Sequence, residues 1–515
     1  MLVTVVVLTV VALGGCVSRR GGEDQHETVP ARPATFADVV PAPVQATQTP
    51  GVTFTIPADP TIITMAGSTE AAHVGAYLAD LLGGATTREG TDPVSGGVAL
   101  LLDPTVGTGE EYQLEVNAGG VTIRAGTGVG LFWGVQTLRQ LMPAQTRAPV
   151  PVPGGRIVDA PRFAYRGVML DVARHFFDVA AVERLIDLVA MYKVNYLHLH
   201  LTDDQGWRIA VDGWPRLTEV GAATEVGGFT GGYYTEDDYR QIVEYAADRY
   251  LTVVPEIDLP GHTNAALASY AELTCDGVAP APYTEIGVGF SALCPTSDAV
   301  GRLIDDTLGE LAELTPGPYL HIGGDEAPTL NADDYATIVD RAQEIVARDG
   351  KTTVAWQAVA ADAAPSTVLQ YYIDDQDVPA LLGAATAGTK VIMSPANHAY
   401  LDQKYDPQTR IGLTWAGPTS VEEAYGWDPA TYLPGVGEEA VLGVEAPLWT
   451  ETVTTVDDIE YLMFPRLSAI AEIGWSPAST HNWTAFRQRL GAQAPRWTAL
   501  GVDFARADGV PWVAA

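Results

Sequence analysis

The amino-acid sequence predicts an α/β fold in which a (β/α)₈ barrel, or TIM barrel, follows a small α+β domain. Eight short apolar segments alternate with helical patterns over the last part of the chain, about 330 residues long. A mixed pattern of strands and helices precedes them. The chain has 515 residues, of which 47% are hydrophobic, so it can form two or three domains with large cores.

Residues 1–16 predict a signal peptide with a lipobox. They form an apolar run that ends in Leu13-Gly14-Gly15-Cys16, although no Lys or Arg precedes it. A short apolar stretch before small residues indicates export rather than a spanning helix. Lipidation of Cys16 would anchor the protein to the outer face of the cell membrane. An ordinary cleaved signal, giving a secreted protein, or a short anchor is the alternative. Residues 17–45 lack apolar periodicity and predict a flexible tether.

Residues 46–155 predict the small α+β domain, which we expect to be non-catalytic. Short strand patterns and two helical patterns occur in it, at residues 98–102, 112–116 and 121–124 and at residues 70–82 and 128–141. Gly119-Gly120 indicates a hairpin turn between the last two strands. The Pro- and Gly-rich residues 148–155 predict a linker.

Residues 156–515 predict the barrel, which we expect to be the catalytic domain. Its strand patterns are residues 167–172, 194–201, 251–257, 319–323, 353–357, 368–373, 390–394 and 441–445. Helical patterns such as residues 179–192, 235–249 and 298–314 separate several of them. A doubly wound sheet is the alternative, but it would need a Gly-rich phosphate loop after its first strand.

Charge and cysteines limit the partners and the compartment. The formal net charge of −35 is unfavourable for nucleic acid and for anionic membrane surfaces, so we expect membrane attachment only through a lipid at Cys16. Cys275 and Cys294 are the two cysteines of the body of the chain. In an exported protein they favour a disulfide over free thiols.

Polar and aromatic residues follow every predicted barrel strand. They include Asp171, Arg174, His175, Asp203, Asp204, Glu256, Asp258, His262, His321, Asp325, Glu326, Trp356, Tyr371, Tyr372, residues 397–402, Trp449 and Glu451. Active sites of such barrels are built at these strand ends. Carboxylates, aromatic rings and an arginine together indicate a sugar site. For Trp207, Trp214 and Trp475 we expect core packing instead.

The adjacent carboxyls of Asp325 and Glu326 indicate a particular kind of glycosidase. Retaining enzymes ordinarily place a nucleophilic carboxylate across the sugar ring from the acid. Neighbouring residues cannot easily flank one anomeric carbon from opposite faces. The pair instead favours Glu326 as proton donor and Asp325 as the group that holds a nucleophile belonging to the substrate.

Five motifs give the chain a resemblance to glycoside hydrolase family 20. They are YRGVMLDVARHFF (165–177), LHLHLTDDQGWRI (197–209), VPEIDLPGHTNAAL (254–267), HIGGDE (321–326) and APLWTE (446–451). The resemblance covers residues 161–477 and implies a β-N-acetylhexosaminidase that needs neither cofactor nor metal. Its substrates would be N-acetylhexosamine-terminated oligosaccharides, cleaved from the non-reducing end with retention through an oxazolinium intermediate.

The resemblance also implies a role for individual residues. Glu326 resembles the general acid/base, Asp325 the carboxylate that orients the acetamido N–H, and Tyr400 the hydroxyl that binds the acetamido oxygen. The remaining polar positions are implied to bind the outer hydroxyls or to support the acid: Arg174, Asp402 and Glu451, and behind the acid Asp203, Asp258 and His262.

The acetamido pocket departs from the family at one position. Trp356 and Trp449 resemble two of its aromatic walls. Where the family commonly has a third tryptophan, this chain has Tyr372. We expect the tyrosine to replace that wall with a smaller face, which affects N-acyl tolerance and affinity.

Two other functions remain open from the residues alone. A metal-dependent amidohydrolase would use His198 and His200, which share one face of a strand, with His262, His321 and Asp325. In that class the histidine pair lies on the first barrel strand. Here it lies in the second strand, within an apolar run, so we favour an inward, packed pair. A lipid-anchored sugar-binding protein without activity is the other alternative.

Overall fold

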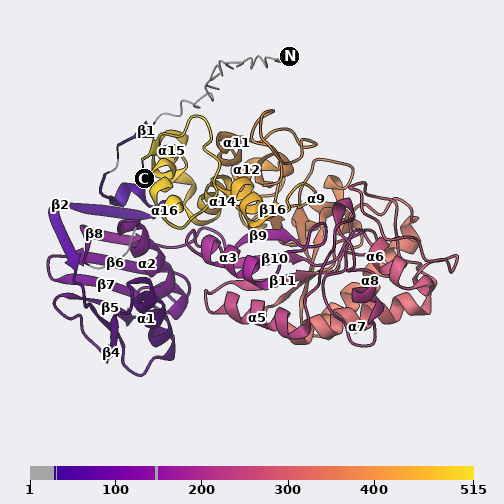
Figure 1. The fold of residues 1–515 in the computed structure, drawn as a ribbon, viewed down its shortest axis with the longest axis horizontal. Helices are drawn as coiled ribbons and strands as arrows, with labels where there is room; N and C mark the ends of the chain where they lie inside the picture. Colours follow the sequence, from indigo (N-terminus) through magenta and orange to yellow (C-terminus); the bar gives the residue numbers. More distant parts are fainter. Residues whose placement is uncertain (1–27, 31, 145–148, 515) are drawn as a thin grey trace, which may run out of the picture.

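The computed structural model describes residues 28–30, 32–144 and 149–514. The predicted signal peptide, Cys16 and residues 17–27 of the predicted tether lie outside them. Figure 1 shows an N-terminal domain beside a larger barrel, with the last helices lying over the junction. Among the described residues, no helix is both long and apolar enough to cross a membrane.

The N-terminal domain is a mixed seven-stranded sheet with two helices. Its strands are β2 (Gln45–Ile56), β3 (Thr61–Met65), β4 (Thr86–Gly90), β5 (Gly97–Leu102), β6 (Tyr112–Asn117), β7 (Gly120–Ala125) and β8 (Val150–Asp159). They are arranged in the order β2-β8-β6-β7-β5-β3-β4. The helices are α1 (Thr69–Leu81) and α2 (Gly128–Leu141). The predicted helices, the three strands and the β6–β7 hairpin are therefore confirmed.

The predicted linker at 148–155 is wrong where the structure describes it, because strand β8 begins at Val150. Pro151 and Pro153 misled the prediction, since proline interrupts the interior of a sheet. In this segment β8 pairs with β2 alone, and β6 joins only from Gly155 onward. A strand with one partner can accommodate residues that lack an N–H group.

The predicted tether is too long at its C-terminal end. A short 3₁₀ helix, η1 (Phe36–Asp38), is followed by Val39 and Val40, which are fully buried. The side chain of Gln140 binds both backbone groups of Val40, accepting from its N–H at 2.9 Å. The apolar Phe36 and the Val39-Val40 pair thus fold onto the domain, despite the Pro- and Ala-rich composition around them. Strand β1 (Thr28–Val29) pairs in parallel with β17 (Trp512–Val513).

The second domain is a closed barrel of eight parallel strands, as predicted. The strands are β9 (Tyr165–Asp171), β10 (Tyr196–His200), β11 (Thr252–Glu256), β12 (Tyr319–His321), β13 (Thr352–Trp356), β14 (Val368–Tyr371), β15 (Val391–Met393) and β16 (Val441–Leu448). Strand β16 pairs with β9 and closes the barrel. Trp207, Trp214 and Trp475 are buried, which confirms the expectation of core packing.

Helices connect and cover the barrel strands. The longer ones are α3 (Val179–Ala190), α5 (Glu236–Ala247), α7 (Asp298–Leu314), α8 (Ala332–Arg348), α9 (Val378–Ala387), α13 (Val456–Met463), α14 (Arg466–Trp475) and α15 (Trp483–Gly491). The shorter ones are α4 (Arg216–Glu219), α6 (Asn264–Ser269), α10 (Ala396–Ala399), α11 (Val421–Tyr425), α12 (Pro429–Tyr432) and α16 (Ala494–Ala499). Further 3₁₀ turns are η2 (Val226–Gly228), η3 (Ala271–Leu273), η4 (Gln357–Ala361) and η5 (Ala478–Thr480). Polar N-caps such as Asp178, Thr235 and Asn331 begin the helices after short loops.

Buried ion pairs join the two domains. The ammonium of Lys193, after α3, lies 2.8 Å from the carboxylate of Asp159 at the end of β8, and both side chains are fully buried. The hydroxyl of Tyr112 and the indole of Trp475 also donate to this carboxylate. Nearby, Arg166 in β9 pairs with Glu110 of the first domain.

Candidate active site

The barrel brings the predicted residues together at the C-terminal ends of its strands. Arg174 follows β9, Asp203 follows β10, Asp258 and His262 follow β11, and Asp325 and Glu326 follow β12. Trp356 ends β13, Tyr372 follows β14, Tyr400 and Asp402 follow β15, and Trp449 and Glu451 follow β16. Contacts run from the acid pair through His262, Asp203 and Arg174 to the ring of Trp449.

A tight backbone turn presents the acid pair. Gly323 and Gly324 have φ angles of 67° and 104°, which side chains rarely adopt. A Cβ atom on Gly323 would lie only 1.7 Å from Asp258 Oδ1, so glycine is required there. Glu326 also has a positive φ, 46°, and its side chain is 42% exposed, whereas that of Asp325 is 12% exposed. The turn thus directs one carboxyl to the surface and keeps the other buried.

His262 connects the acid pair to the carboxylate behind it. Its Nε2 lies 3.4 Å from Glu326 Oε2 and 3.8 Å from Asp325 Oδ2. Its Nδ1 lies 3.1 Å from Asp203 Oδ1. Burial alone would lower the pKa of His262, but Asp203 and Asp258 outweigh burial and raise the pKa well above the usual value. An imidazolium therefore stands next to Glu326 at neutral pH.

The carboxyls beside the acid have raised pKa values because they are buried. Burial raises the pKa of Asp325 to about 6, with His262 opposing the rise and Glu326 adding to it. Burial and the charge of Asp325 raise the pKa of Asp258 well above the usual range. Within the described residues, Asp325 Oδ1 is buried without a hydrogen-bond partner. Such an oxygen is suited to accept a hydrogen bond from a bound ligand.

Arg174 is held in place on several sides. Its guanidinium lies 2.8 Å from Asp203 Oδ2 and 4.8 Å from the centre of the Trp449 ring. Its Nε donates to Gln205 at 3.2 Å. Burial alone would lower the pKa of Arg174, but Asp203 and Asp171 raise it well above the usual value. The arginine is thus a fixed cation in the site.

Asp402 and Glu451 also have a buried oxygen without a partner among the described residues. These atoms are Asp402 Oδ1 and Glu451 Oε2. Burial, reinforced by Glu451, raises the pKa of Asp402 well above its usual range. Burial also raises the pKa of Glu451, although Arg174 opposes the rise. Both groups are available to hydroxyls of a ligand.

Four aromatic rings cluster at these strand ends, and the charge of Asp325 acts on two of them, Tyr372 and Tyr400. The centre of the Trp356 ring lies 5.5 Å from that of Tyr372 and 6.0 Å from that of Trp449. The ring of Tyr400 lies 6.3 Å from that of Trp449 and 6.5 Å from that of Tyr372. These distances connect the four rings in a cycle. Tyr372 is thus among the rings of the predicted pocket, next to Trp356.

The sequence did not point to two residues of the site. Trp415, in the loop between β15 and β16, is 50% exposed and packs edge-on against Tyr400 at 5.7 Å. Gln205 accepts from Arg174 and donates to the carbonyl of Glu285 at 2.9 Å. A tryptophan within a polar loop was the only signal for Trp415, and the contact of Gln205 depends on tertiary structure.

The inward histidine pair is confirmed, because His198 and His200 are fully buried. Four groups of described residues bring possible metal-ligand atoms within 4.8 Å of one another: His198–Glu256–His321, His200–Asp203–Asp258, Asp203–Asp204–His262 and Asp258–His262–Asp325. Both nitrogens of His198 face carboxylates, of Glu256 at 3.0 Å and of Glu445 at 2.9 Å. The histidine pair thus belongs to a network of hydrogen-bonded charges inside the barrel.

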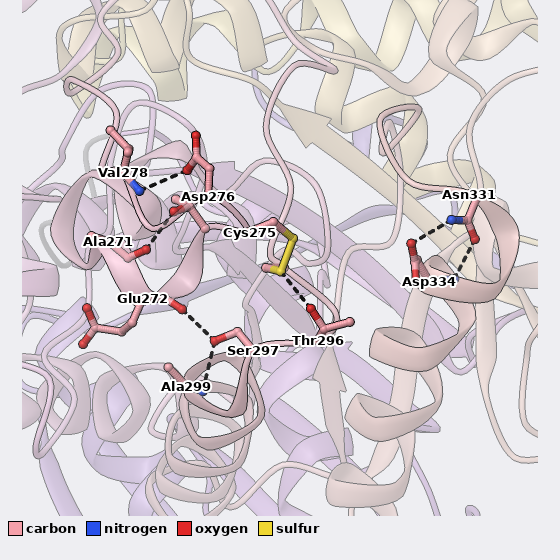
Figure 2. The surroundings of a disulfide bond; sticks show 12 residues. Ala271, Glu272, Cys275, Asp276, Val278, Thr296, Ser297, Ala299, Asn331 and Asp334 are labelled. Carbon is pink, nitrogen blue, oxygen red and sulfur yellow. Dashed lines mark hydrogen bonds between the residues drawn. A yellow bond between two sulfur atoms is a disulfide. The ribbon is translucent and has the colours of Figure 1, made fainter.

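The predicted disulfide is confirmed between Cys275 and Cys294, with their Cα atoms 4.9 Å apart. Figure 2 shows it next to the start of α7, where Ser297 donates to the carbonyl of Glu272 at 2.6 Å. The bridge closes the loop that carries Glu285, whose carbonyl binds Gln205. It therefore braces a loop beside the site.

The barrel, the acid pair and the sugar-binding residue types define a glycosidase. Two matches specify it further. The catalytic-domain model of glycosyl hydrolase family 20 matches residues 163–478, and the model of domain 2 of that family matches residues 37–160. The chain belongs to glycosyl hydrolase family 20, and its enzymatic activity is that of a β-N-acetylhexosaminidase.

Individual relatives agree with this assignment. The chain is 42% identical to a β-N-acetylhexosaminidase from Cellulomonas fimi, over 92% of this chain and 97% of that one. The structure of a family 20 β-N-acetylhexosaminidase from Streptomyces coelicolor superposes with a TM-score of 0.90 at 50% identity, covering 94% of this chain and all of that one. An N-acetyl-β-hexosaminidase from Streptomyces plicatus, solved with Thio-NAglucal, has 51% identity and a TM-score of 0.89, covering 94% of this chain and 99% of that one. The amidohydrolase and the non-enzymatic alternatives are therefore wrong.

Proposed function

We propose that the enzyme removes terminal N-acetylhexosamine residues by substrate-assisted catalysis with retention. The observation that carries the proposal is the buried, unpartnered oxygen of Asp325, whose charge acts on Tyr372 and Tyr400, two of the four clustered aromatic rings. Asp325 and Glu326 both approach the same nitrogen of His262, so they lie on one side of the pocket. A protein nucleophile would have to lie across the ring from the acid.

In the first step, Glu326 gives its proton to the glycosidic oxygen, and the bond from that oxygen to the anomeric carbon breaks. The acetamido carbonyl oxygen of the substrate bonds to the same carbon, forming an oxazolinium ion. Asp325 accepts a hydrogen bond from the acetamido N–H and stabilises the positive charge. The hydroxyl of Tyr400 donates a hydrogen bond to the acetamido oxygen and orients it.

In the second step, Glu326 takes a proton from water. The water oxygen bonds to the anomeric carbon, and the bond to the acetamido oxygen breaks. The product keeps the β configuration, because two displacements occurred at one carbon. Glu326 ends protonated, ready for another cycle.

The remaining residues fix the terminal sugar. Arg174 and the unpartnered oxygens of Asp402 and Glu451 would bind its outer hydroxyls, which supports exo-acting cleavage. An N,N'-diacetylchitobiase from Vibrio harveyi is 29% identical to this chain, which spans 57% of its length. Chitobiose is accordingly the first natural substrate to test, together with N-acetylgalactosaminides.

The test uses an activated aryl glycoside of N-acetylglucosamine and the matching glucoside, which carries a 2-hydroxyl group. Loss of the acetamido group should lower kcat by several orders of magnitude, because it removes the nucleophile. A 2-deoxy-2-fluoro glycoside should leave no covalent sugar adduct on any Asp or Glu in mass spectrometry. A stable adduct on an Asp or Glu, together with retained turnover of the glucoside that lacks the acetamido group, would overturn the proposal.

We also propose that the enzyme is exported and lipid-anchored at Cys16. The disulfide supports an oxidising compartment. The wild-type chain, expressed in a bacterium, should partition into detergent with the membranes, and a Cys16→Ser variant should not. Equal partitioning of the two would contradict the anchor.

A further inference from the structure

Glu256, the last residue of β11, is fully buried and has four nitrogen atoms around its carboxylate. Its Oε2 accepts from His200 Nδ1 and, at 3.0 Å, from His198 Nε2. Its Oε1 accepts from the indole N–H of Trp356 at 3.0 Å and lies 2.9 Å from His321 Nδ1. These four partners come from three neighbouring strands, β10, β12 and β13.

One oxygen of Glu256 leads to the proton donor. His200 bridges Glu256 and Asp203, with its Nε2 2.8 Å from Asp203 Oδ2. The other oxygen of Asp203 faces His262, which reaches Glu326. An imidazole that donates to two carboxylates must carry both protons. Burial alone would lower the pKa of His200, but Glu256 and Asp203 raise it well above the usual value.

The other oxygen of Glu256 leads to the acetamido pocket. Trp356 is 1% exposed, and its only polar atom donates to Glu256. The ring of Trp356 contacts the rings of Tyr372 and Trp449. One carboxylate therefore fixes a wall of the pocket and also the proton relay behind the acid, which consists of His200, Asp203 and His262.

We infer that Glu256 is a positioning residue that couples the acetamido pocket to the proton relay of Glu326. It touches no substrate and acts through Trp356 and through His200. The inference rests on the proposed function, since it takes the aromatic rings as the acetamido pocket and Glu326 as the acid.

The charges around Glu256 support this arrangement. Burial alone would raise the pKa of Glu256, but His321, His200 and His198 together hold it well below the usual range. Burial and the charge of Asp325 raise the pKa of Asp258, and Glu256 adds to the rise. Glu256 is thus the anion between several protonated or polar groups, and a neutral amide cannot accept from all of them.

The decisive experiment compares Glu256→Gln with Glu445→Gln. Glu445, in β16, is equally buried and also binds His198, but its other partners are Tyr165 and Gln370. It contacts neither Trp356 nor His200 by any hydrogen bond among the described residues. It is therefore the matched control for loss of one buried carboxylate.

Two ratios are measured on each variant. The first is kcat/KM for N-acetyl against N-propionyl aryl glucosaminides, which reports on the pocket. The second is kcat for an activated aryl against an alkyl N-acetylglucosaminide, which reports on proton donation. Glu256→Gln should lower kcat about 10- to 100-fold. This is the loss typically found when a carboxylate that orients a metal-binding histidine is removed, and Glu256 orients His200 in a comparable way. Glu256→Gln should also weaken the preference for acetyl and enlarge the aryl-to-alkyl ratio.

Glu445→Gln should lower thermal stability and change either ratio by less than about threefold. Equal changes in both variants, or unchanged ratios in Glu256→Gln, would overturn the inference. If Glu256→Gln does not fold, His200→Gln takes its place. The glutamine side chain keeps a donor to Asp203, removes the link to Glu256, and should enlarge the aryl-to-alkyl ratio. No change in that ratio would then overturn the inference.

Failure of the proposed function would be visible separately. In that case the wild-type enzyme would tolerate replacement of the 2-acetamido group by hydroxyl, a measurement that involves no variant. The Glu256→Gln results therefore test the inference only if the wild-type enzyme is first shown to require the acetamido group of its substrate.

Discussion

Replacement of Asp325 by Asn tests the electrostatic part of the mechanism. The substitution keeps the size of the side chain and removes its charge. Asp325 is buried, so its charge acts through a medium of low dielectric on the oxazolinium ion. Removing one group preorganised for a developing charge typically costs about 2.7–4 kcal/mol, or roughly 10²- to 10³-fold in kcat. We expect a loss of that size with little change in KM.

The pH profile gives the same prediction a second readout. The pKa of Asp325 is raised to about 6, so the carboxylate form is lost as the pH falls through 6. Below that pH, kcat/KM of the wild type should fall about tenfold per pH unit, because only the ionised form stabilises the cation. Asp325→Asn has no carboxyl to protonate at this position and should lack this acid limb.

The assay is initial-rate hydrolysis of an aryl N-acetylglucosaminide from acid to neutral pH. Circular dichroism and a thermal melt would establish that the variant is folded. An acid limb of unchanged position and depth in Asp325→Asn would refute the reasoning, since another group would then cause it. A loss confined to KM would equally refute it, because Asp325 would then bind substrate without stabilising the transition state.

Three further predictions concern other parts of the molecule. Glu326→Gln should lose most activity on alkyl glycosides and less on activated aryl glycosides, and equal losses would contradict its role as acid. Asp159→Asn should leave Lys193 buried without a counter-charge and cost about 3–5 kcal/mol in urea unfolding. Because burial lowers the pKa of Lys193, this deficit should shrink at alkaline pH, where the amine deprotonates; a constant deficit would argue against the ion pair. Trp415→Ala should raise KM for chitobiose more than for an aryl glycoside, since the exposed indole lies beside Tyr400 at the mouth of the pocket; equal KM changes would exclude contact with the second sugar.

The barrel could be predicted because its strands are short apolar runs that end in polar residues. This pattern survives in every strand from β9 to β16. Strand β2 escaped prediction because the side chains of its first half are exposed and mostly polar, and only residues 52–56 alternate between apolar and polar side chains. Strand β8 escaped prediction because Pro151 and Pro153 are typical of a linker. They fit a strand only because one side of β8 has no partner strand at these residues, which the sequence does not show.

Site residues were predictable where their role depends on residue type at a strand end. Glu256 was noted in this way, but its role depends on partners from three strands, and no local pattern encodes that arrangement. The contact of Gln205 with Arg174 and Glu285 likewise joins three separate loops. Trp415 contacts Tyr400 only because the long segment between β15 and β16 folds back on itself, and the sequence does not reveal that fold.

The different roles of Asp325 and Glu326 follow from their environments rather than from their chemistry. The two carboxyls are adjacent in sequence and face the same nitrogen of His262. The positive φ of Glu326 turns its side chain outward, where a glycosidic oxygen and then water can reach it. Asp325 remains buried, and burial raises its pKa while leaving one oxygen without a partner among the described residues. An acid that must exchange protons with solvent has to be accessible, and a group that must hold an amide N–H has to be fixed and dry. A tight turn at Gly323 and Gly324 supplies both conditions to two consecutive residues.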